Sequence, residues 1–393
     1  MPELPLLRFI PFRRRDIVSM CLAQQRLDPN QRQRFEQACA HIEKQFQLDF
    51  HRVREELKNS YAPFDPDADT RLIETVPAAA DSGELAEKLE AVLNRANYEK
   101  VTAQKLDAAM HSTSLFQVRL YVELEDFEEV LLYTRGRSQR EETLKEFFGL
   151  WRKKVQFTNY DRVVLFLRVK DEVNSDSTLG DCPPGSTMIR LFQNVPAADM
   201  EMLFPNIRVG MRTLDKLMIG VPALVSGGIV FTTKLGATLV LLGSLLGFWL
   251  GLSSEAVELD RRTLLILFTG LGTLGAYLWK QFTNFKTRKL RYTQALTENL
   301  YFKLLDNNAG VLYRVLDEAE ESECKESYLA YHFLLSAEGP ISAEGLDQTI
   351  ENWLADTWQC RIDFEIADAL AKLDALGMAR EAQGMWELCD TGQ

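Results

Sequence analysis

Three aspartates at alternate positions form the most suggestive ligand motif in this chain, at Asp65, Asp67 and Asp69. A calcium-binding loop places oxygen ligands at such positions, with glycine at the sixth position and glutamate at the twelfth. Here those two positions hold Thr70 and Val76. Because both requirements are missing, we expect a capped turn, with no bound metal or other cofactor.

The other residues that could bind metal or act as nucleophiles are scattered. The six cysteines form no Cys-x-x-Cys pair, and no histidine lies at zinc-ligand spacing from them. We expect these thiols to be buried and reduced. No phosphate-binding glycine loop, nucleophile elbow or His-Glu-x-x-His motif occurs. We therefore expect no catalytic residues and a protein that is not an enzyme; an unrecognised active site is the alternative.

The negative charge of the chain is concentrated at one end. Residues 303–393 contain 19 Asp and Glu against 6 Lys and Arg, a net charge of −13, whereas the whole chain carries −12. A surface this acidic repels phosphate backbones. We therefore expect no nucleic-acid binding by this region.

A long apolar stretch, residues 217–282, predicts an integral membrane protein. Leu217–Leu252 contains one charged residue, Lys234, and a bilayer crossing requires about 20 helical residues. Three crossings would be possible, but basic residues flank both ends of the stretch, which favours two. We expect crossings at about 235–252 and 263–281, joined as a hairpin. A buried hairpin inside a soluble core is disfavoured because the two spans lack a polar stripe.

Small and basic residues around these spans suggest what they contact. Glycine every four residues lets helix backbones approach closely, within the hairpin or between copies of the chain. Basic residues next to a span lie at the membrane interface and can hold anionic lipid headgroups. The predicted helix-packing residues are Gly243, Gly247, Gly251, Gly272 and Ala276, and the predicted interface residues are Lys234, Lys280, Lys286, Arg288, Lys289 and Arg291.

The region before the spans, residues 1–216, is expected to be an α+β domain. Asp28 and Pro29 form a helix start, and apolar residues at three- and four-residue spacing predict a helix over 29–59. Alternating apolar residues predict antiparallel strands within about 116–192. The first two, 118–124 and 130–134, are expected to form a hairpin that turns at Glu125 and Asp126.

The region after the spans is expected to be helical. An amphipathic helix over 283–310 leads into an acidic domain, residues 311–393. We expect helices at about 311–319, 323–335, 343–357 and 364–376, then a small hairpin of 378–381 and 385–388, which resembles a winged helix. Its recognition-helix position carries four acidic residues and a single Lys372. A DNA reader needs basic residues there, so we expect a protein-interaction module.

Five stretches of the sequence resemble a family of two-span membrane proteins known only as a domain of unknown function, which includes the mitochondrial transmembrane protein 143. They occur in order at 9–14, 61–69, 195–205, 296–302 and 306–310. The resemblance implies a membrane anchor in a bacterial inner or mitochondrial membrane. It implies no reaction and no functional residues.

Together these patterns predict an α+β integral membrane protein with a two-helix transmembrane hairpin. We expect it in a bacterial inner membrane, with both termini cytoplasmic. The predicted function is a membrane-anchored scaffold or adaptor, with the bilayer and a protein partner or second copy as its contacts. The alternative is an oligomeric, channel-like assembly built on the glycine-rich helix face.

Overall fold

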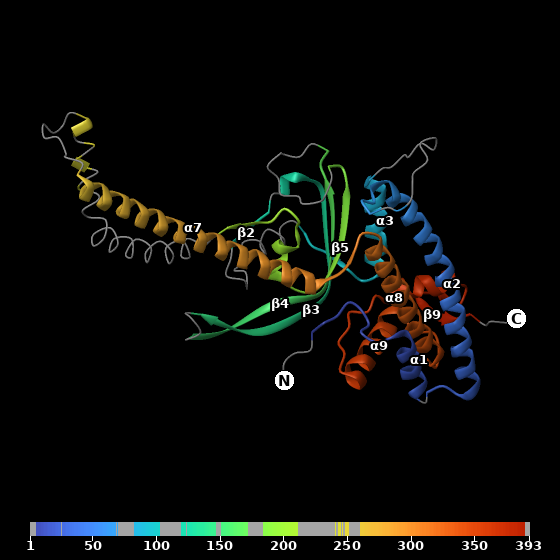
Figure 1. The fold of residues 1–393 in the computed structure, drawn as a ribbon. Coiled ribbons are helices and arrows are strands. Elements are labelled where there is room, and N and C mark those ends of the chain that lie inside the picture. Colours follow the sequence, from blue (N-terminus) through green and yellow to red (C-terminus); the bar gives the residue numbers. More distant parts are fainter. Residues whose placement is uncertain are drawn as a thin grey trace, which may run out of the picture. The chain divides into compact units, whose positions relative to one another are not determined.

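The computed structural model describes residues 5–24, 26–67, 69, 82–102, 119–122, 124–146, 151–171, 184–210, 240, 243–244, 246, 248–250 and 260–389. The chain divides into two compact units. Unit 1 consists of Met1–Thr113, Val122–Asn206 and Phe302–Gln393, and unit 2 of Ser114–Tyr121 and Ile207–Tyr301. Unit 1 thus combines the two ends of the sequence (Figure 1).

The N-terminal helices of unit 1 begin and end where local sequence requires. Helix α1 spans Arg14–Ala23, α2 spans Pro29–Tyr61 and α3 spans Ser82–Arg95. Asp28 and Gln31 form a reciprocal capping box at the start of α2, with Pro29 in the first turn. A short 3-10 helix, Ala62–Phe64, follows α2. The apolar face of α2 is buried, so this helix contributes one wall of the core.

The sheet of unit 1 has five antiparallel strands in the order β1-β3-β4-β5-β7. Strand β1 spans Glu99–Lys100, β3 Phe127–Glu146, β4 Trp151–Val169, β5 Thr187–Pro196 and β7 Leu304–Asn307. Successive side chains of a strand point to opposite faces. Val164 and Phe166 of β4 therefore join the helical core, whereas Val163, Leu165 and Leu167 are buried on the other face.

The hairpin predicted to turn at Glu125 and Asp126 is not formed by the described residues. Strand β3 pairs with β1 and β4, and a 3-10 helix, Leu124–Asp126, precedes it. Strand β2, Arg119–Tyr121, pairs with β6, Arg208–Gly210, in unit 2. The alternating pattern identified strands correctly but could not identify their partners, because pairing is decided by distant residues.

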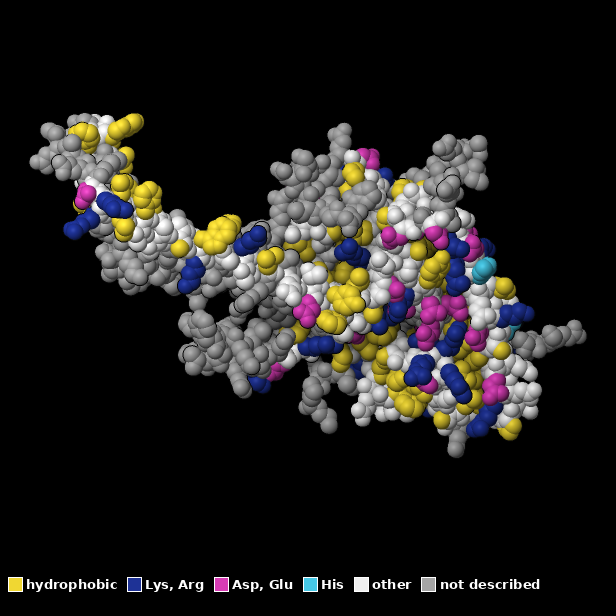
Figure 2. All heavy atoms as spheres, viewed as in Figure 1, with side chains coloured by type: hydrophobic (Ala, Val, Ile, Leu, Met, Phe, Trp, Pro, Cys, Tyr) yellow, Lys and Arg dark blue, Asp and Glu magenta, His cyan; other side chains and the backbone are white. Residues whose placement is uncertain are grey.

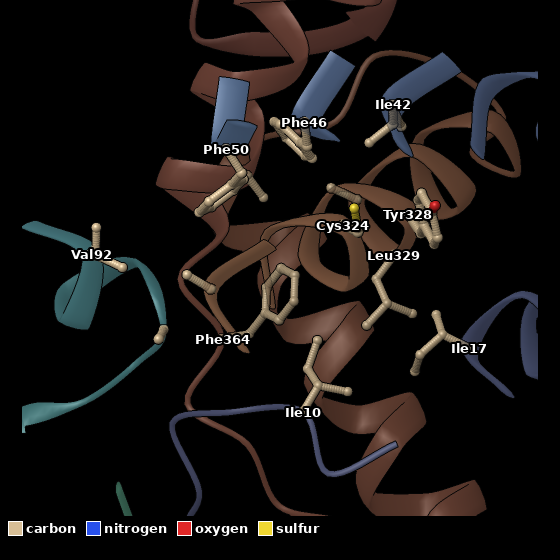
Figure 3. Packing of buried hydrophobic residues seen from close by; sticks show 14 of the residues in the cluster. Ile10, Ile17, Ile42, Phe46, Phe50, Val92, Cys324, Tyr328, Leu329 and Phe364 are labelled. Atoms are coloured by element: carbon tan, nitrogen blue, oxygen red, sulfur yellow. The ribbon is translucent and has the colours of Figure 1, made fainter. Parts of the chain in front are cut away.

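The C-terminal part of unit 1 is centred on one long helix. Helix α8 spans Ala309–Leu335 and packs against α1, α2, α3 and α10. Helices α9, Ala343–Trp358, and α10, Ile366–Ala375, follow, and then the hairpin of β8, Ala379–Ala382, and β9, Met385–Leu388. Ile341 forms an antiparallel bridge to Trp386 of β9. Figure 3 shows Cys324, Tyr328 and Leu329 of α8 lying between side chains of α1 and α2.

One asparagine fixes the junction between β7 and α8. Asn308 is largely buried and has a positive φ of 47°. Its backbone N–H donates to the Ile189 carbonyl at 2.6 Å, and the Ile189 N–H donates to its Oδ1 at 3.2 Å. Its amide nitrogen donates to the carboxylate of Asp67. The stretch 306–310 thus has a structural role, because its third residue, Asn308, links the sheet to the turn after α2.

The membrane hairpin predicted over residues 217–282 is wrong. Most of the first expected crossing lies outside the described residues. The second is part of α7, Arg261–Lys303, in which the apolar residues from Thr263 end at Trp279 and Lys280 follows, short of about 20 apolar residues. In the described part of the chain, no helix combines the length and the apolar character needed to cross a membrane. The prediction of a multi-pass protein of a bacterial inner membrane is overturned with it.

Candidate functional site

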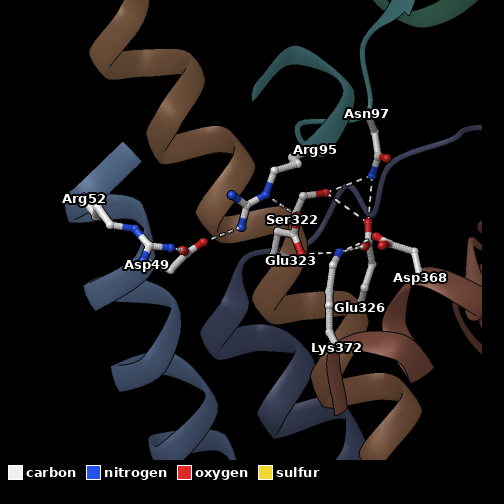
Figure 4. Close-up of polar contacts among 9 residues, drawn as sticks. All are labelled: Asp49, Arg52, Arg95, Asn97, Ser322, Glu323, Glu326, Asp368 and Lys372. Carbon is white, nitrogen blue, oxygen red and sulfur yellow. Dashed lines mark hydrogen bonds and ion pairs between the residues drawn. The ribbon is translucent and has the colours of Figure 1, made fainter. Parts of the chain in front are cut away.

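A group of charged and polar side chains surrounds two buried carboxylates of α8, Glu323 and Glu326, where α8 meets α2, α3 and α10 (Figure 4). We call it the buried ion cluster. It brings together acidic residues of α8 and cations from both ends of the sequence. Its members are Asp49, Arg95, Asn97, Ser322, Glu323, Glu326, Asp368 and Lys372.

Glu323 occupies the centre of the buried ion cluster. Its side chain is 0% exposed, and its Oε1 accepts a hydrogen bond from Arg95 Nε at 2.8 Å. Lys372 forms an ion pair with the same carboxylate from α10. Arg95 also pairs with Asp49 of α2 at 3.0 Å and lies 4.0 Å from the centroid of the Phe50 ring. A buried carboxylate requires such partners, since an unpaired charge in the core is strongly destabilising.

Glu326 lies one turn further along α8 and is the titratable member. Asn97 Nδ2 donates to its Oε1 at 2.7 Å and to Ser322 Oγ at 2.9 Å, and Ser322 Oγ donates to the same Oε1 at 3.2 Å. Lys372 Nζ lies 3.6 Å from its other oxygen. Burial raises the pKa of Glu326 to about 7, although the charge of Lys372 acts in the opposite direction. This carboxyl therefore gains or loses a proton near neutral pH.

A second set of ion pairs joins α8 to the sheet. Arg135 of β3 pairs with Glu318 at 3.1 Å, and Arg162 of β4 lies 3.9 Å from the same carboxylate. The Tyr98 hydroxyl donates to Glu318 at 2.7 Å, and the Arg135 guanidinium lies 4.9 Å from the Tyr98 ring centroid. Basic and acidic side chains are also interspersed on the surface of the helical part of unit 1 (Figure 2).

The cavities near these charged groups are small. One, of about 230 Å³, is lined by residues that include Arg135, Glu318, Ser322 and Lys325, and another, of about 60 Å³, shares Phe9 with it. Ligand pockets for small molecules usually measure about 300–1,000 Å³. A carboxyl that titrates near neutrality beside a serine hydroxyl could act as a general base. The lining of these cavities includes Ser322 but not Glu326, so the arrangement fits a structural role better than a reaction.

In the described part of the chain, the predicted helix-packing glycines do not lie against a neighbouring helix. Gly243 and Gly272 have no described atom within 4 Å of where a Cβ would stand, and Ala276 is exposed. Gly247 and Gly251 lie outside the described residues. A role of this face in contacts between copies of the chain stays a prediction.

The predicted interface cations are spread along α7. Lys280 and Lys286 are exposed, and Arg288, Lys289 and Arg291 belong to the same helix. Lys234 lies outside the described residues. Because the predicted membrane spans are overturned, the reason for placing these cations at a bilayer surface is lost.

The aspartate motif forms the turn that its sequence predicts. The Asp67 N–H donates to Asp65 Oδ1 at 3.1 Å. Among the residues described, no group of His, Cys, Asp and Glu side chains could hold a metal ion. Thr70 and Val76, which decided against a calcium loop, lie outside the described residues.

Sequence reasoning missed the buried ion cluster. The available signal was the density of acidic residues in 317–326 within a segment that is otherwise apolar. The sequence pattern predicts two helices here, 311–319 and 323–335, whereas the structure has one helix through both. The cations that neutralise them include Arg95 and Arg135, which lie more than 180 positions earlier, and local pattern could not connect them.

The fold and the cluster define an α+β protein with an antiparallel sheet and a charge-linked helical core. Over residues 127–310 the chain is similar to a family described as Protein of unknown function (DUF3754). This match runs from β3 to the start of α8 and brings no activity with it. The resemblance to a family that includes transmembrane protein 143 stays a prediction. No solved structure matches the chain.

Proposed function

We propose that this protein is a scaffold or adaptor that binds a protein partner through its C-terminal region. The order of α8, the Ile341 bridge, α9, α10 and the β8–β9 hairpin resembles that of a winged helix. In that resemblance α10 occupies the recognition-helix position. The exposed face of α10 therefore decides which class of partner can bind.

The observation that supports this proposal is the direction taken by Lys372. It is the basic residue of α10, and its side chain is turned into the buried ion cluster, with 17% exposed. Asp368 and Asp374 are exposed, as are three alanines, Ala367, Ala371 and Ala375. Small and acidic side chains leave room for another helix or loop and repel nucleic-acid phosphates. This face fits a protein surface that carries basic residues.

The proposal is tested by placing a photo-crosslinking residue at Ala371 in the full-length chain and isolating the adducts from the cells that make it. We expect a defined protein adduct at Ala371. A matched probe at Asn352, on the exposed face of α9, should give none. Identical adduct patterns at the two positions, or no adduct at either, would contradict the adaptor function.

A second measurement uses the purified partner. Ala371→Arg adds bulk and positive charge to α10 without removing any contact, so partner binding should weaken at least about tenfold, more than 1.4 kcal/mol. Asn352→Arg provides the same change on α9 and should leave the affinity within about twofold. Equal effects of the two variants would show that α10 is not the interface.

A further inference from the structure

An extended segment at the start of the chain lies against the C-terminal region of unit 1. We call residues 5–13 the N-terminal strap. The Leu7 N–H donates to the Arg361 carbonyl at 3.0 Å, and the Asp363 N–H donates to the Leu7 carbonyl at 2.8 Å. Leu7 and Ile362 thereby form a parallel β-bridge. This is how an extended peptide adds to an exposed backbone edge.

Side chains of the strap anchor it at alternate sites. Ile10 is 3% exposed and lies beside Phe364 and Leu329 in the core (Figure 3). The Phe12 ring meets the edge of the Trp358 ring, with centroids 6.1 Å apart. Apolar anchors of this kind, spaced along an extended backbone, give a peptide its specificity.

Charge also matches the strap to the surface beneath it. Arg8 forms an ion pair with Glu365, just before α10. Lys325 of α8 donates to the Ile10 carbonyl at 3.3 Å. Beyond the strap, Arg14 pairs with Glu320 at 3.3 Å. The surface therefore accepts a segment that combines apolar and basic residues.

The strap is attached more loosely than the core around it. Leu6 is 56% exposed, and Arg8 and Glu365 are both over 40% exposed. Residues Leu6–Phe9 line the cavity of about 60 Å³, and Phe9–Arg13 line the cavity of about 230 Å³. On the side that faces these cavities, the strap is not fully covered by other side chains. The strap can thus leave its place at lower cost than a helix of the core.

We propose that the surface under the strap is a peptide-binding site, which the strap occupies in cis and an extended basic and apolar segment of a partner protein occupies in trans. We call this surface the strap groove; it comprises Lys325, Trp358, Arg361, Ile362, Asp363 and Glu365. The proposal rests on the adaptor function and names the class of partner segment. The strap itself supplies the pattern that the groove recognises, an apolar residue, an arginine and a buried isoleucine at positions 7, 8 and 10.

The test measures binding of a fluorescent peptide with the sequence of residues 5–15 to the full-length protein by anisotropy. In the unaltered protein the strap competes, so binding should be weak. Ile10→Asp removes the buried anchor and should raise the affinity for the peptide at least tenfold. Leu6→Asp, at an exposed position of the same strap, is the matched control and should change the affinity less than twofold.

A charge exchange shows whether the peptide binds in the groove. Glu365→Arg, combined with the released strap, should weaken the peptide several-fold, and a peptide that carries Glu in place of Arg8 should recover that loss. If Ile10→Asp damages the fold, seen as a changed circular dichroism spectrum, then Arg8→Glu releases the strap by repulsion from Glu365 and replaces it in the test.

Three results would overturn the proposal. They are no gain in peptide binding by a folded strap variant, equal binding of a scrambled peptide of the same composition, and peptide binding that is unaffected by Glu365→Arg. Ala371→Arg lies outside the strap groove and should leave peptide binding unchanged. Failure of the strap groove is thus distinguishable from failure of the α10 interface.

Discussion

At the scale of single residues, two buried titratable groups oppose each other as the pH changes. The pKa of Glu326 is raised from 4.5 to about 7 by burial. A raised carboxyl pKa contributes stability that is present below the unfolded value and lost as the pH rises through about 7. The pKa of His332 is lowered from 6.5 to about 4 by burial, so it contributes stability that is lost as the pH falls through that window.

Glu326→Gln isolates the carboxyl contribution. Glutamine resembles the protonated acid, so the variant should lose the decline in stability that the wild type shows between about pH 4.5 and 7. The rise in the pKa of Glu326 corresponds to a loss of at most about 3 kcal/mol in the free energy of unfolding over this pH range. Urea unfolding at several pH values, compared with the exposed control Glu338→Gln, provides the measurement. The His332 contribution cancels in the difference; parallel pH profiles for the two variants would refute a titrating Glu326.

At the scale of elements, α2 could be predicted from the sequence and α8 could not. The capping residues and apolar spacing of α2 are local, and the helix begins at Pro29 as expected and ends two residues later than predicted. Helix α8 was predicted as two helices, 311–319 and 323–335, whereas one helix spans Ala309–Leu335. Strand β7 was assigned to the end of a helix, since its pairing with β5 depends on residues more than 100 positions earlier.

Asn308 lies at the junction between β7 and α8, so its substitution tests how much this junction stabilises the fold. Asn308→Ala removes the two side-chain hydrogen bonds, to the Ile189 N–H and to Asp67, and places a non-glycine residue without a polar side chain at positive φ. We expect a loss of about 2–4 kcal/mol. Asn308→Gly relieves the backbone strain but not the lost bonds, so about 1–2 kcal/mol is expected. Chemical unfolding of both variants checks that Asn308→Ala is less stable than Asn308→Gly. An alanine variant as stable as the glycine variant would contradict the prediction.

At the scale of the whole molecule, acidic residues in the C-terminal part of the sequence form ion pairs with basic residues in its N-terminal part. The acidic excess of residues 303–393 is partly neutralised inside unit 1 by Arg14, Arg95 and Arg135. The sequence revealed the asymmetry but not its partners, because no local pattern places Arg95 against Glu323. The error about the apolar stretch arose at this scale too, since a long apolar run with basic residues at both ends was interpreted as a membrane hairpin.

A fragment of residues 303–393 should therefore not fold alone. Without the earlier residues, α8 would expose the apolar side chains that face α1, α2 and α3, and Glu323 would lose Arg95. We expect little near-ultraviolet circular dichroism and strong binding of a hydrophobic dye from this fragment, with neither feature in the full chain. A cooperative thermal transition in the isolated fragment would show that the C-terminal region is an independent domain.

Because α8 fills the centre of unit 1, the order of synthesis matters. Helix α2 is complete by Tyr61, whereas the helix that covers its apolar face begins at Ala309. At about 5–20 residues per second, the ribosome adds that partner on the order of tens of seconds later. Throughout this interval α2 lacks its packing against α8, and Phe35 lacks its contact with His332. The unfinished chain therefore exposes apolar surface of the kind that chaperones protect from aggregation.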